Sequence, residues 1–325
     1  MYAAEENHSG VARILLNGGA NSSILMEDGF SALHIAVQLG HLAVANDLVK
    51  AGADLEARTF DGVSPLDLAA QHGRPALVAA LIEAGANVHC RRGSDGGTPL
   101  FAAADEGHVH IVKQLLRAKA NPLSTRTTLN DLAGDTGLWK ETRVPLDDAA
   151  GGGHTEVVRE LIQQVGIEGC AGSSGGVDAL CSAARNHYVH MMAMLTNAGV
   201  VDTGQALISA ARGGGDEKAV KFLLQQRQLV DSPTSLASYV NFCDYLGRTP
   251  LFAIIAPWDT TQVRAHMISL RVLRLLVDAG ADTSLPLRVT TAALRITSTD
   301  TTMSTARLWL APPNASIVRK CIDQH

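Results

Sequence analysis

Two pairs of histidines in this sequence have a spacing that could allow them to bind a metal ion. His108 and His110 stand two positions apart, and His187 and His190 stand three apart. Histidines at such spacings can hold zinc, but a zinc site takes further ligands from Cys, His or acidic side chains. No Cys or acidic side chain lies at a useful spacing from either pair. The sequence therefore predicts no metal ion.

Glycine-rich stretches at 151–153, 172–178 and 213–215 raise the question of phosphate binding. A phosphate-binding loop follows a strand and runs into Lys-Ser or Lys-Thr, whereas these stretches lack that pair and follow predicted helices. The kinase signatures are also missing from the sequence. We therefore predict no catalytic residue, no cofactor and no enzyme activity. A deep closed pocket beside 228–268 would reopen the question.

The composition favours a core made of short stacked helices. Hydrophobic residues make up 46% of the 325 residues, but aromatic residues make up only 4%. Such a core relies on Ala, Leu, Val and Ile in thin layers with close backbone approach. The net charge of −5 lacks the clustered positive charge of a nucleic-acid-binding surface. Five scattered cysteines form neither a disulfide framework nor a zinc motif, which favours a reducing compartment.

The sequence predicts no insertion into a membrane. No segment approaches the about 20 apolar residues of a membrane-spanning helix. The N-terminal "MYAAEENHSG" lacks the basic start and the apolar stretch of a secretory signal. We expect a cytoplasmic protein, with the nucleus as an alternative.

A repeat of about 33 residues supplies the helices. "DGFSALHIAVQLGHLAVANDLVKAGAD" from Asp28 aligns with "DGVSPLDLAAQHGRPALVAALIEAGAN" from Asp61 and with "GGTPLFAAADEGHVHIVKQLLRAKAN" from Gly96. The leucine of each copy recurs at spacings of 33, 34, 46, 34, 27 and 44, at Leu33, Leu66, Leu100, Leu146, Leu180, Leu207 and Leu251. Departures from 33 indicate insertions or deletions in loops.

Each copy predicts two short helices. Pro65 starts the first helix at a position where its missing N–H costs nothing, and Gly73 ends it. A second apolar stripe runs over 77–82, and Gly85 ends that helix. Neither helix can bury its apolar side alone, so the copies must stack on one another. Asp61-Gly62 and Asp95-Gly96 predict turns that project as fingers.

These copies resemble ankyrin repeats over about 3–282. The tetrapeptide Thr-Pro-Leu-His of that family is only partly kept: His34 retains the histidine, and Pro65, Pro99, Pro145 and Pro250 retain the proline. The resemblance implies an all-α solenoid of stacked antiparallel helix pairs with short β-hairpin fingers. We predict a partial capping repeat at 1–27, about seven units over 28–282, and a degenerate capping repeat or tail at 283–325. Insertions are expected near 122–143, 228–243 and 256–268.

The resemblance also implies that the chain binds a protein partner through finger tips and first helices. The residues carried over to these positions are Leu25, Glu27, Asp28, Phe30, Gln38, Leu39, Arg58, Phe60, Asp61, Val63, Gln71, His72, Arg92, Ser94, Asp95, Asp105 and Glu106. Leu25, Phe30 and Phe60 either contact the partner or pack between neighbouring fingers. Trp139, in the long insertion, either contacts the partner or covers the groove between two units.

The leading hypothesis is a non-catalytic scaffold or adaptor, monomeric on its own, that binds a protein and no nucleic acid. The alternative is a regulatory or targeting region of a longer enzyme or channel polypeptide. Some family members are hydroxylated on a finger Asn, but Ser23, Glu56 and His89 occupy those positions in this sequence. The identity of the partner is not encoded in any recognisable motif.

Overall fold

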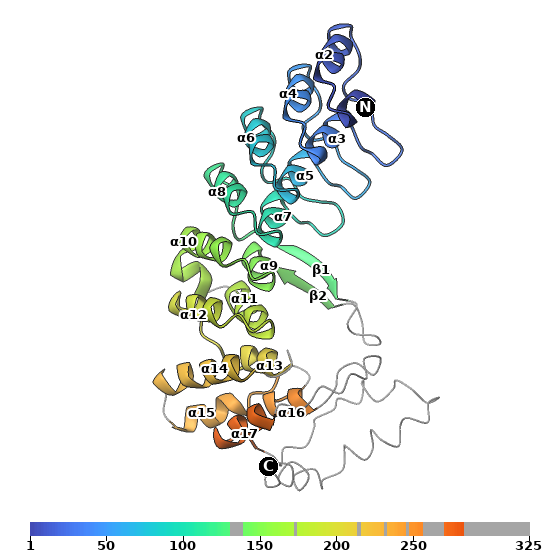
Figure 1. The fold of residues 1–325 in the computed structure, drawn as a ribbon. Helices are drawn as coiled ribbons and strands as arrows, with labels where there is room; N and C mark the ends of the chain where they lie inside the picture. Colours follow the sequence, from blue (N-terminus) through green and yellow to red (C-terminus); the bar gives the residue numbers. More distant parts are fainter. Residues whose placement is uncertain are drawn as a thin grey trace, which may run out of the picture. The chain divides into compact units, whose positions relative to one another are not determined.

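The computed structural model describes residues 1–130, 139–171, 174–212, 216–230, 233–244, 247–255 and 270–282, and its helices follow one another in short antiparallel pairs (Figure 1). The predicted helix-pair solenoid is therefore confirmed. The chain divides into two compact units, Met1–Leu129 with Lys140–Gly169 and Asn130–Trp139 with Cys170–His325.

The first unit stacks successive helix pairs and carries a two-stranded hairpin before its last pair. The first helix of each pair packs on the first helix of the next, and the second helices do the same. These elements are α1 (Tyr2–Glu5), α2 (Ser9–Asn17), α3 (Ala32–Leu39), α4 (Leu42–Lys50), α5 (Pro65–Gln71), α6 (Pro75–Glu83), α7 (Pro99–Asp105), α8 (Val109–Arg117), β1 (Arg126–Asn130), β2 (Trp139–Arg143), α9 (Pro145–Gly151) and α10 (Thr155–Ala171).

The second unit continues the pattern with less regular lengths. Its helices are α11 (Ser174–Arg185), α12 (Val189–Asn197), α13 (Gln205–Arg212), α14 (Glu217–Val230), α15 (Pro233–Val240), α16 (Pro250–Ile255) and α17 (Leu270–Asp278). The repeat leucines Leu180, Leu207 and Leu251 are buried on the first helix of their pairs. The predicted insertion near 256–268 and the predicted cap or tail at 283–325 lie outside the described residues.

The insertion expected near 228–243 contains a helix of its own. α15 places Tyr239 and Val240 in the core, and the Tyr239 hydroxyl donates to Asp202 Oδ2 at 2.6 Å. Arg227 lies over the Tyr239 ring, 5.4 Å from its centroid. The two buried side chains explain why this segment folds against its neighbours as an additional helix.

Hydrogen-bonded capping boxes start two of the first helices, α3 and α5. Ser64 precedes α5, and its hydroxyl accepts from the backbone N–H of Asp67 at 3.1 Å. Asp67 Oδ2 in turn accepts from the Ser64 N–H at 3.1 Å and from its hydroxyl at 2.8 Å. Pro65 is the first residue of α5, as the sequence predicts. These bonds satisfy donors that a helix start otherwise leaves without partners.

His34 forms the same box at the start of α3 and must be neutral to do so. Its Nδ1 accepts from the Ser31 N–H at 3.1 Å, so Nε2 carries the proton and donates to the Val63 carbonyl at 3.2 Å. Burial of the ring lowers the pKa of His34 below its ordinary value. If Nδ1 were protonated, its N–H would face the Ser31 N–H, and the capping box would lose this hydrogen bond.

Acid is therefore expected to weaken the first unit through His34. Because its folded-state pKa is lowered, its contribution to the free energy of unfolding is complete above the ordinary pKa. That contribution is lost as the pH falls through the lowered value. Urea titrations between about pH 7.5 and about pH 5 should show a smaller acid loss in His34→Asp, which copies the Asp67 box. His72→Asn, at an exposed position, should match the wild type, and an equal loss in all three would contradict the assignment.

Candidate functional site

Three turns project from the helix stack of the first unit, and we name them finger 1 (21–31), finger 2 (54–64) and finger 3 (87–98). Finger 1 closes with the Met26 N–H on the Phe30 carbonyl at 2.8 Å and a bridge between Leu25 and Ser31. Asp28 Oδ1 accepts from the Phe30 N–H at 3.0 Å, which shapes the tip. Leu25, Glu27 and Asp28 are exposed there. Phe30 is half-buried, with its ring centroid 5.6 Å from that of His34.

Finger 2 presents Phe60 and Asp61 to solvent at its tip. The Thr59 N–H donates to the Val63 carbonyl at 3.1 Å, and the Gly62 N–H donates to the Thr59 carbonyl at 2.8 Å. The tip is also tied to finger 1, because the Phe60 N–H donates to the Asp28 carbonyl at 3.1 Å. Phe60 is 83% exposed, while Val63 is half-buried. The tip is therefore fixed in the backbone although its large side chain is free.

Finger 3 is held by an internal turn and by finger 2. The Arg92 N–H donates to the Gly97 carbonyl at 2.8 Å, and Asp95 Oδ1 accepts from the Gly97 N–H at 2.9 Å. The Arg58 guanidinium donates to the Arg91 carbonyl at 3.4 Å, across from finger 2. Ser94 is exposed at the tip, whereas Arg92 and Asp95 are half-buried.

Gly62 allows the close approach of fingers 2 and 3. A Cβ at Gly62 would lie 2.4 Å from the Gly93 nitrogen, which is too close for any side chain. Gly62 also has a φ of +73°, in the region that favours glycine. The two backbones thus meet without an intervening side chain.

The long insertion forms a hairpin that is anchored on α9. The Thr127 N–H donates to the Asp95 carbonyl of finger 3 at 2.8 Å. Arg126 on β1 and Arg143 on β2 pair with the two oxygens of Asp148, with N–O distances of 2.9 and 3.2 Å. The Asp148 side chain is completely buried. Trp139 begins β2, but its side chain lies outside the described residues, so both roles considered for it stay predictions.

The C-terminal ends of the first helices carry the other residues that the sequence predicted to contact a partner, and they form a second row along the first unit. Leu39 is 44% exposed, and His72, Asp105 and Glu106 are also exposed, whereas Gln38 and Gln71 are half-buried. Backbone carbonyls of this row bind the next pair: Gln71 accepts from His108 Nε2 at 3.0 Å, and Asp105 from His154 Nε2 at 2.7 Å. These histidines therefore fix how one helix pair sits on the next.

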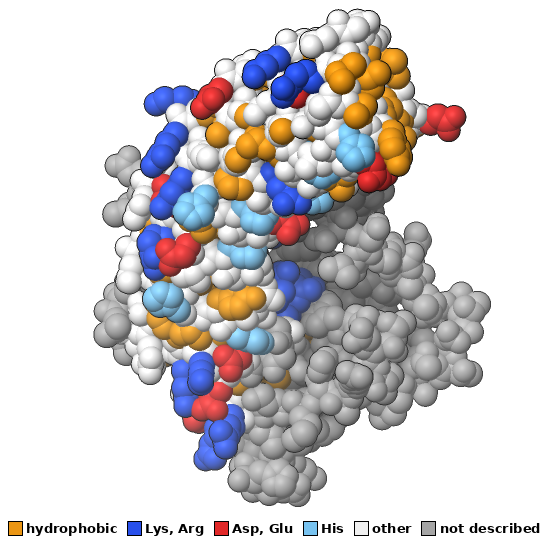
Figure 2. Space-filling model, turned by 45° about the horizontal axis from the view of Figure 1, so that its top comes forward, with side chains coloured by type: hydrophobic (Ala, Val, Ile, Leu, Met, Phe, Trp, Pro, Cys, Tyr) orange, Lys and Arg blue, Asp and Glu red, His pale blue; other side chains and the backbone are white. Residues whose placement is uncertain are grey.

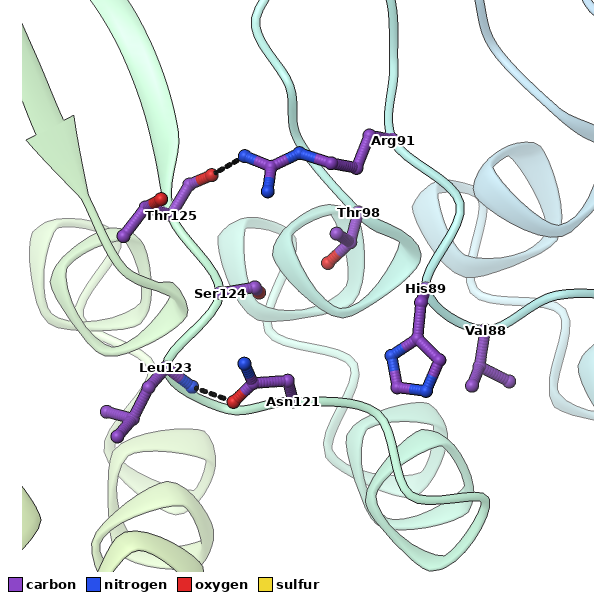
Figure 3. A pocket seen from close by; sticks show the side chains of 8 residues that line it. All are labelled: Val88, His89, Arg91, Thr98, Asn121, Leu123, Ser124 and Thr125. Atoms are coloured by element: carbon purple, nitrogen blue, oxygen red, sulfur yellow. Dashed lines mark hydrogen bonds between the residues drawn. The ribbon is translucent and has the colours of Figure 1, made fainter.

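A shallow cavity of about 260 Å³ opens between finger 3 and the segment that follows α8. Val88 and His89 line one side and Leu123 the other, with the Arg91 guanidinium donating to the Thr125 carbonyl across it (Figure 3). Its volume lies below the usual range for small-molecule sites, about 300–1,000 Å³.

The structure brings the finger residues into one hydrogen-bonded row and places the helix-end residues in another. It also exposes side chains that the sequence did not single out, Ile24 at 56% and Met26 at 47%. Their exposure could have been predicted from the sequence, because both residues stand in finger 1 next to Leu25. The sequence did not indicate the pairing of Arg126 and Arg143 with Asp148, because the two arginines lie in an insertion that has no second copy for comparison.

No group of three or more His, Cys, Asp or Glu side chains in the described part of the chain could hold a metal ion. Among the same residues, no helix has both the length and the apolar character needed to cross a membrane.

Residues 1–59 and 66–168 match the family model for ankyrin repeats, in 3 copies. With the repeat and the helix pairs, this match shows that the chain belongs to the ankyrin repeat family. Ankyrin repeats are in general modules for protein–protein interaction and are typically non-catalytic. A comparison with curated proteins gave no significant match.

Proposed function

We propose that this protein is a non-catalytic scaffold or adaptor that binds a protein partner. The contact surface consists of the tips of the fingers and the exposed ends of the first helices in the first unit. Family membership supports binding of a protein in general. The particular surface rests on the exposure and the backbone order of the fingers described above.

The observation that carries the proposal is Phe60. Among the large hydrophobic side chains of the described residues, Phe60 is the most exposed, at 83%. Its backbone is fixed by its bond to Asp28 and by the turn of finger 2. Aromatic side chains are enriched in protein interfaces, and a contact residue that is already ordered loses less entropy on binding.

The charges around the fingers favour a protein partner over a polyanion. Arg58 lies 3.6 Å from Glu56, and Arg92 lies 3.8 Å from Asp95, so basic groups on the fingers have acidic neighbours. Asp105 and Glu106 add exposed negative charge at the end of α7. A nucleic acid needs unpaired basic side chains in a row, whereas a mixed surface suits a protein.

A photo-crosslinking amino acid at position 60 tests this surface directly. In extracts of cells that express the chain, position 60 should yield a discrete protein adduct, and position 201 should not. Val201 is a suitable control because it is 62% exposed and lies in the second unit.

Substitution gives the quantitative version of the test. Phe60→Ser should reduce the amount of the crosslinked protein that co-purifies with the chain by about tenfold or more, as expected for an interface hot spot. Its free energy of unfolding should stay within about 0.5 kcal/mol of the wild type, since the side chain is exposed. Val201→Ser should change neither quantity. Equal co-purification with the wild type and with Phe60→Ser would contradict the proposed surface.

A further inference from the structure

The cavity beside finger 3 is lined by hydroxyl groups that lack the partners expected for them. Ser124 Oγ is buried there and makes no hydrogen bond within the described residues. Thr98, 5% exposed, directly precedes α7, but its side chain makes no bond to the helix start. Figure 3 shows the two residues on facing sides of the cavity. Because a buried hydroxyl without a partner costs free energy, the pair indicates a site for an acceptor from outside.

The preceding repeat unit shows what satisfies the same two positions. Thr98 and Ser124 correspond to Ser64 and Cys90, each 34 residues earlier. Ser64 Oγ donates to Asp67 Oδ2 at 2.8 Å, and Cys90 Sγ donates to the same oxygen at 3.7 Å. A carboxylate therefore accepts hydrogen bonds from both positions in that unit.

In the unit that contains the cavity, a phenyl ring replaces this carboxylate. Phe101 stands at the position of Asp67 and is fully buried. Its ring lies under the Arg126 guanidinium, 5.4 Å from the ring centroid, and offers no acceptor to Thr98 or Ser124. The unit thus retains the donors of a carboxylate site without the carboxylate itself.

A cation and an amide complete the lining. The Arg91 guanidinium donates to the Thr125 carbonyl, and Gly96 leaves room for it, because a Cβ there would lie 3.2 Å from one of its nitrogens. Among the described residues, no acidic side chain lines the cavity or pairs with Arg91. Asn121 Oδ1 accepts from the Leu123 N–H at 3.0 Å, which leaves its NH₂ group as a donor. The lining therefore suits an anionic group.

We propose that this cavity binds the carboxylate of a glutamate or aspartate side chain of the protein partner. The inference rests on the proposed function only in taking the partner to be a protein. The carboxylate pairs with Arg91 and accepts from the hydroxyls of Ser124 and Thr98. Finger 3 contacts finger 2, which carries Phe60, so one partner can reach both. Basic and acidic side chains are interspersed over the face shown in Figure 2, which disfavours a polyanion.

Nuclear magnetic resonance of the full chain tests the cavity without the partner. The probe is the tripeptide Ac-Gly-Glu-Gly-NH₂, and the matched control is Ac-Gly-Gln-Gly-NH₂. The glutamate tripeptide should shift the signals of Arg91, Asn121 and Ser124 saturably, with a Kd on the order of 1–10 mM for a single ion pair and its hydrogen bonds. The glutamine tripeptide should bind at least about tenfold more weakly, because it carries no charge.

Substitutions assign the binding to the cavity. Arg91→Met should weaken binding of the glutamate tripeptide by about fivefold or more, and Ser124→Ala by about 2- to 10-fold, the range of one hydrogen bond. Arg117→Met, at an exposed arginine outside the cavity, and Phe60→Ser should bind it like the wild type. Circular dichroism checks that the variants fold.

Three results would overturn the proposal. The first is equal binding of the glutamate and glutamine tripeptides, and the second is binding that survives both cavity substitutions. The third is binding of the phosphoserine tripeptide but not of the glutamate tripeptide, because the occupant would then be a phosphate.

Ser124→Ala also has an expected effect on the free protein. Because its hydroxyl has no partner, its removal should leave the melting temperature within about 1 °C of the wild type or raise it. Ser64→Ala, at the bonded equivalent, should lower the melting temperature by about 2 °C or more. If both variants melted equally low, the Ser124 hydroxyl would already be satisfied and the proposal would be wrong.

Co-purification separates a failure of this inference from a failure of the proposed function. Arg91→Met should reduce recovery of the protein that crosslinks to position 60 by about fivefold or more. A loss with Phe60→Ser but not with Arg91→Met would overturn the carboxylate site alone. No loss with either variant would contradict the proposed function, whereas tripeptide binding would still support the carboxylate site.

Discussion

Leu66→Asp is expected to unfold the repeats around α5. Leu66 is 1% exposed on a helix that packs against α3, α6 and α7. The substitution removes the packing of a leucine and places a carboxylate in the apolar core. Such a change costs several kcal/mol, roughly 4–5 or more, which is a large part of the stability of a domain. Far-ultraviolet circular dichroism during urea unfolding should show loss of helix at much lower urea, or already without urea.

Leu39→Asp is the matched control for this result. Leu39 is also a leucine on a first helix, but it is 44% exposed. We expect a change within about 0.5 kcal/mol, because the carboxylate stays in water. Leu81→Asp, at 1% exposure on α6, should behave like Leu66→Asp. If Leu66→Asp and Leu39→Asp melted alike, the assignment of the core would be wrong.

The second large effect is expected from the buried carboxylate beneath the long hairpin. Arg126→Met keeps apolar bulk beside the Phe101 ring, over which the guanidinium lies at 5.4 Å. It leaves the Asp148 carboxylate, which is completely buried, with Arg143 as its ionic partner. Removing one partner of a buried ion pair typically costs about 3–5 kcal/mol. Urea unfolding of the full chain should report a loss of this size.

A double substitution tests whether the loss comes from the ion pair. Arg126→Met combined with Asp148→Asn should recover more than half of the stability lost in Arg126→Met, because the buried charge of Asp148 is then removed as well. Arg117→Met, at an exposed arginine at the end of α8, should be nearly neutral. Losses that simply add in the double variant would show that Arg126 acts through packing alone.

The repeat made much of the fold predictable from the sequence. Pro65 marked the start of α5, and the leucines at Leu33, Leu66 and Leu100 marked the buried side, because each copy faces the same neighbours. The match to the ankyrin family extends this agreement to residues 1–59 and 66–168. A one-dimensional stack repeats its local physics, so one well-understood unit explains the next.

The parts without a second copy were less predictable. α15 lies in a segment that the sequence showed only as extra length, and its buried Tyr239 bonds Asp202, a residue from an earlier helix pair. The pairing of Arg126 and Arg143 with Asp148 likewise crosses an insertion. The exposure of individual finger side chains also depended on their position: Phe30 is half-buried beside His34, whereas Phe60 points into solvent. The residue type was identical, so only the position in the finger distinguishes them.

The close approach of Gly62 and Gly93 has a consequence for how this family member can diverge. Because two backbones meet there, the spacing of fingers 2 and 3 does not depend on which side chains occupy the tips. Phe60, Asp61 and Ser94 can therefore be replaced during evolution, or in a designed library, while the spacing between the backbones of the two fingers stays the same. Selection can act on partner choice and on folding almost separately, as long as Gly62 remains.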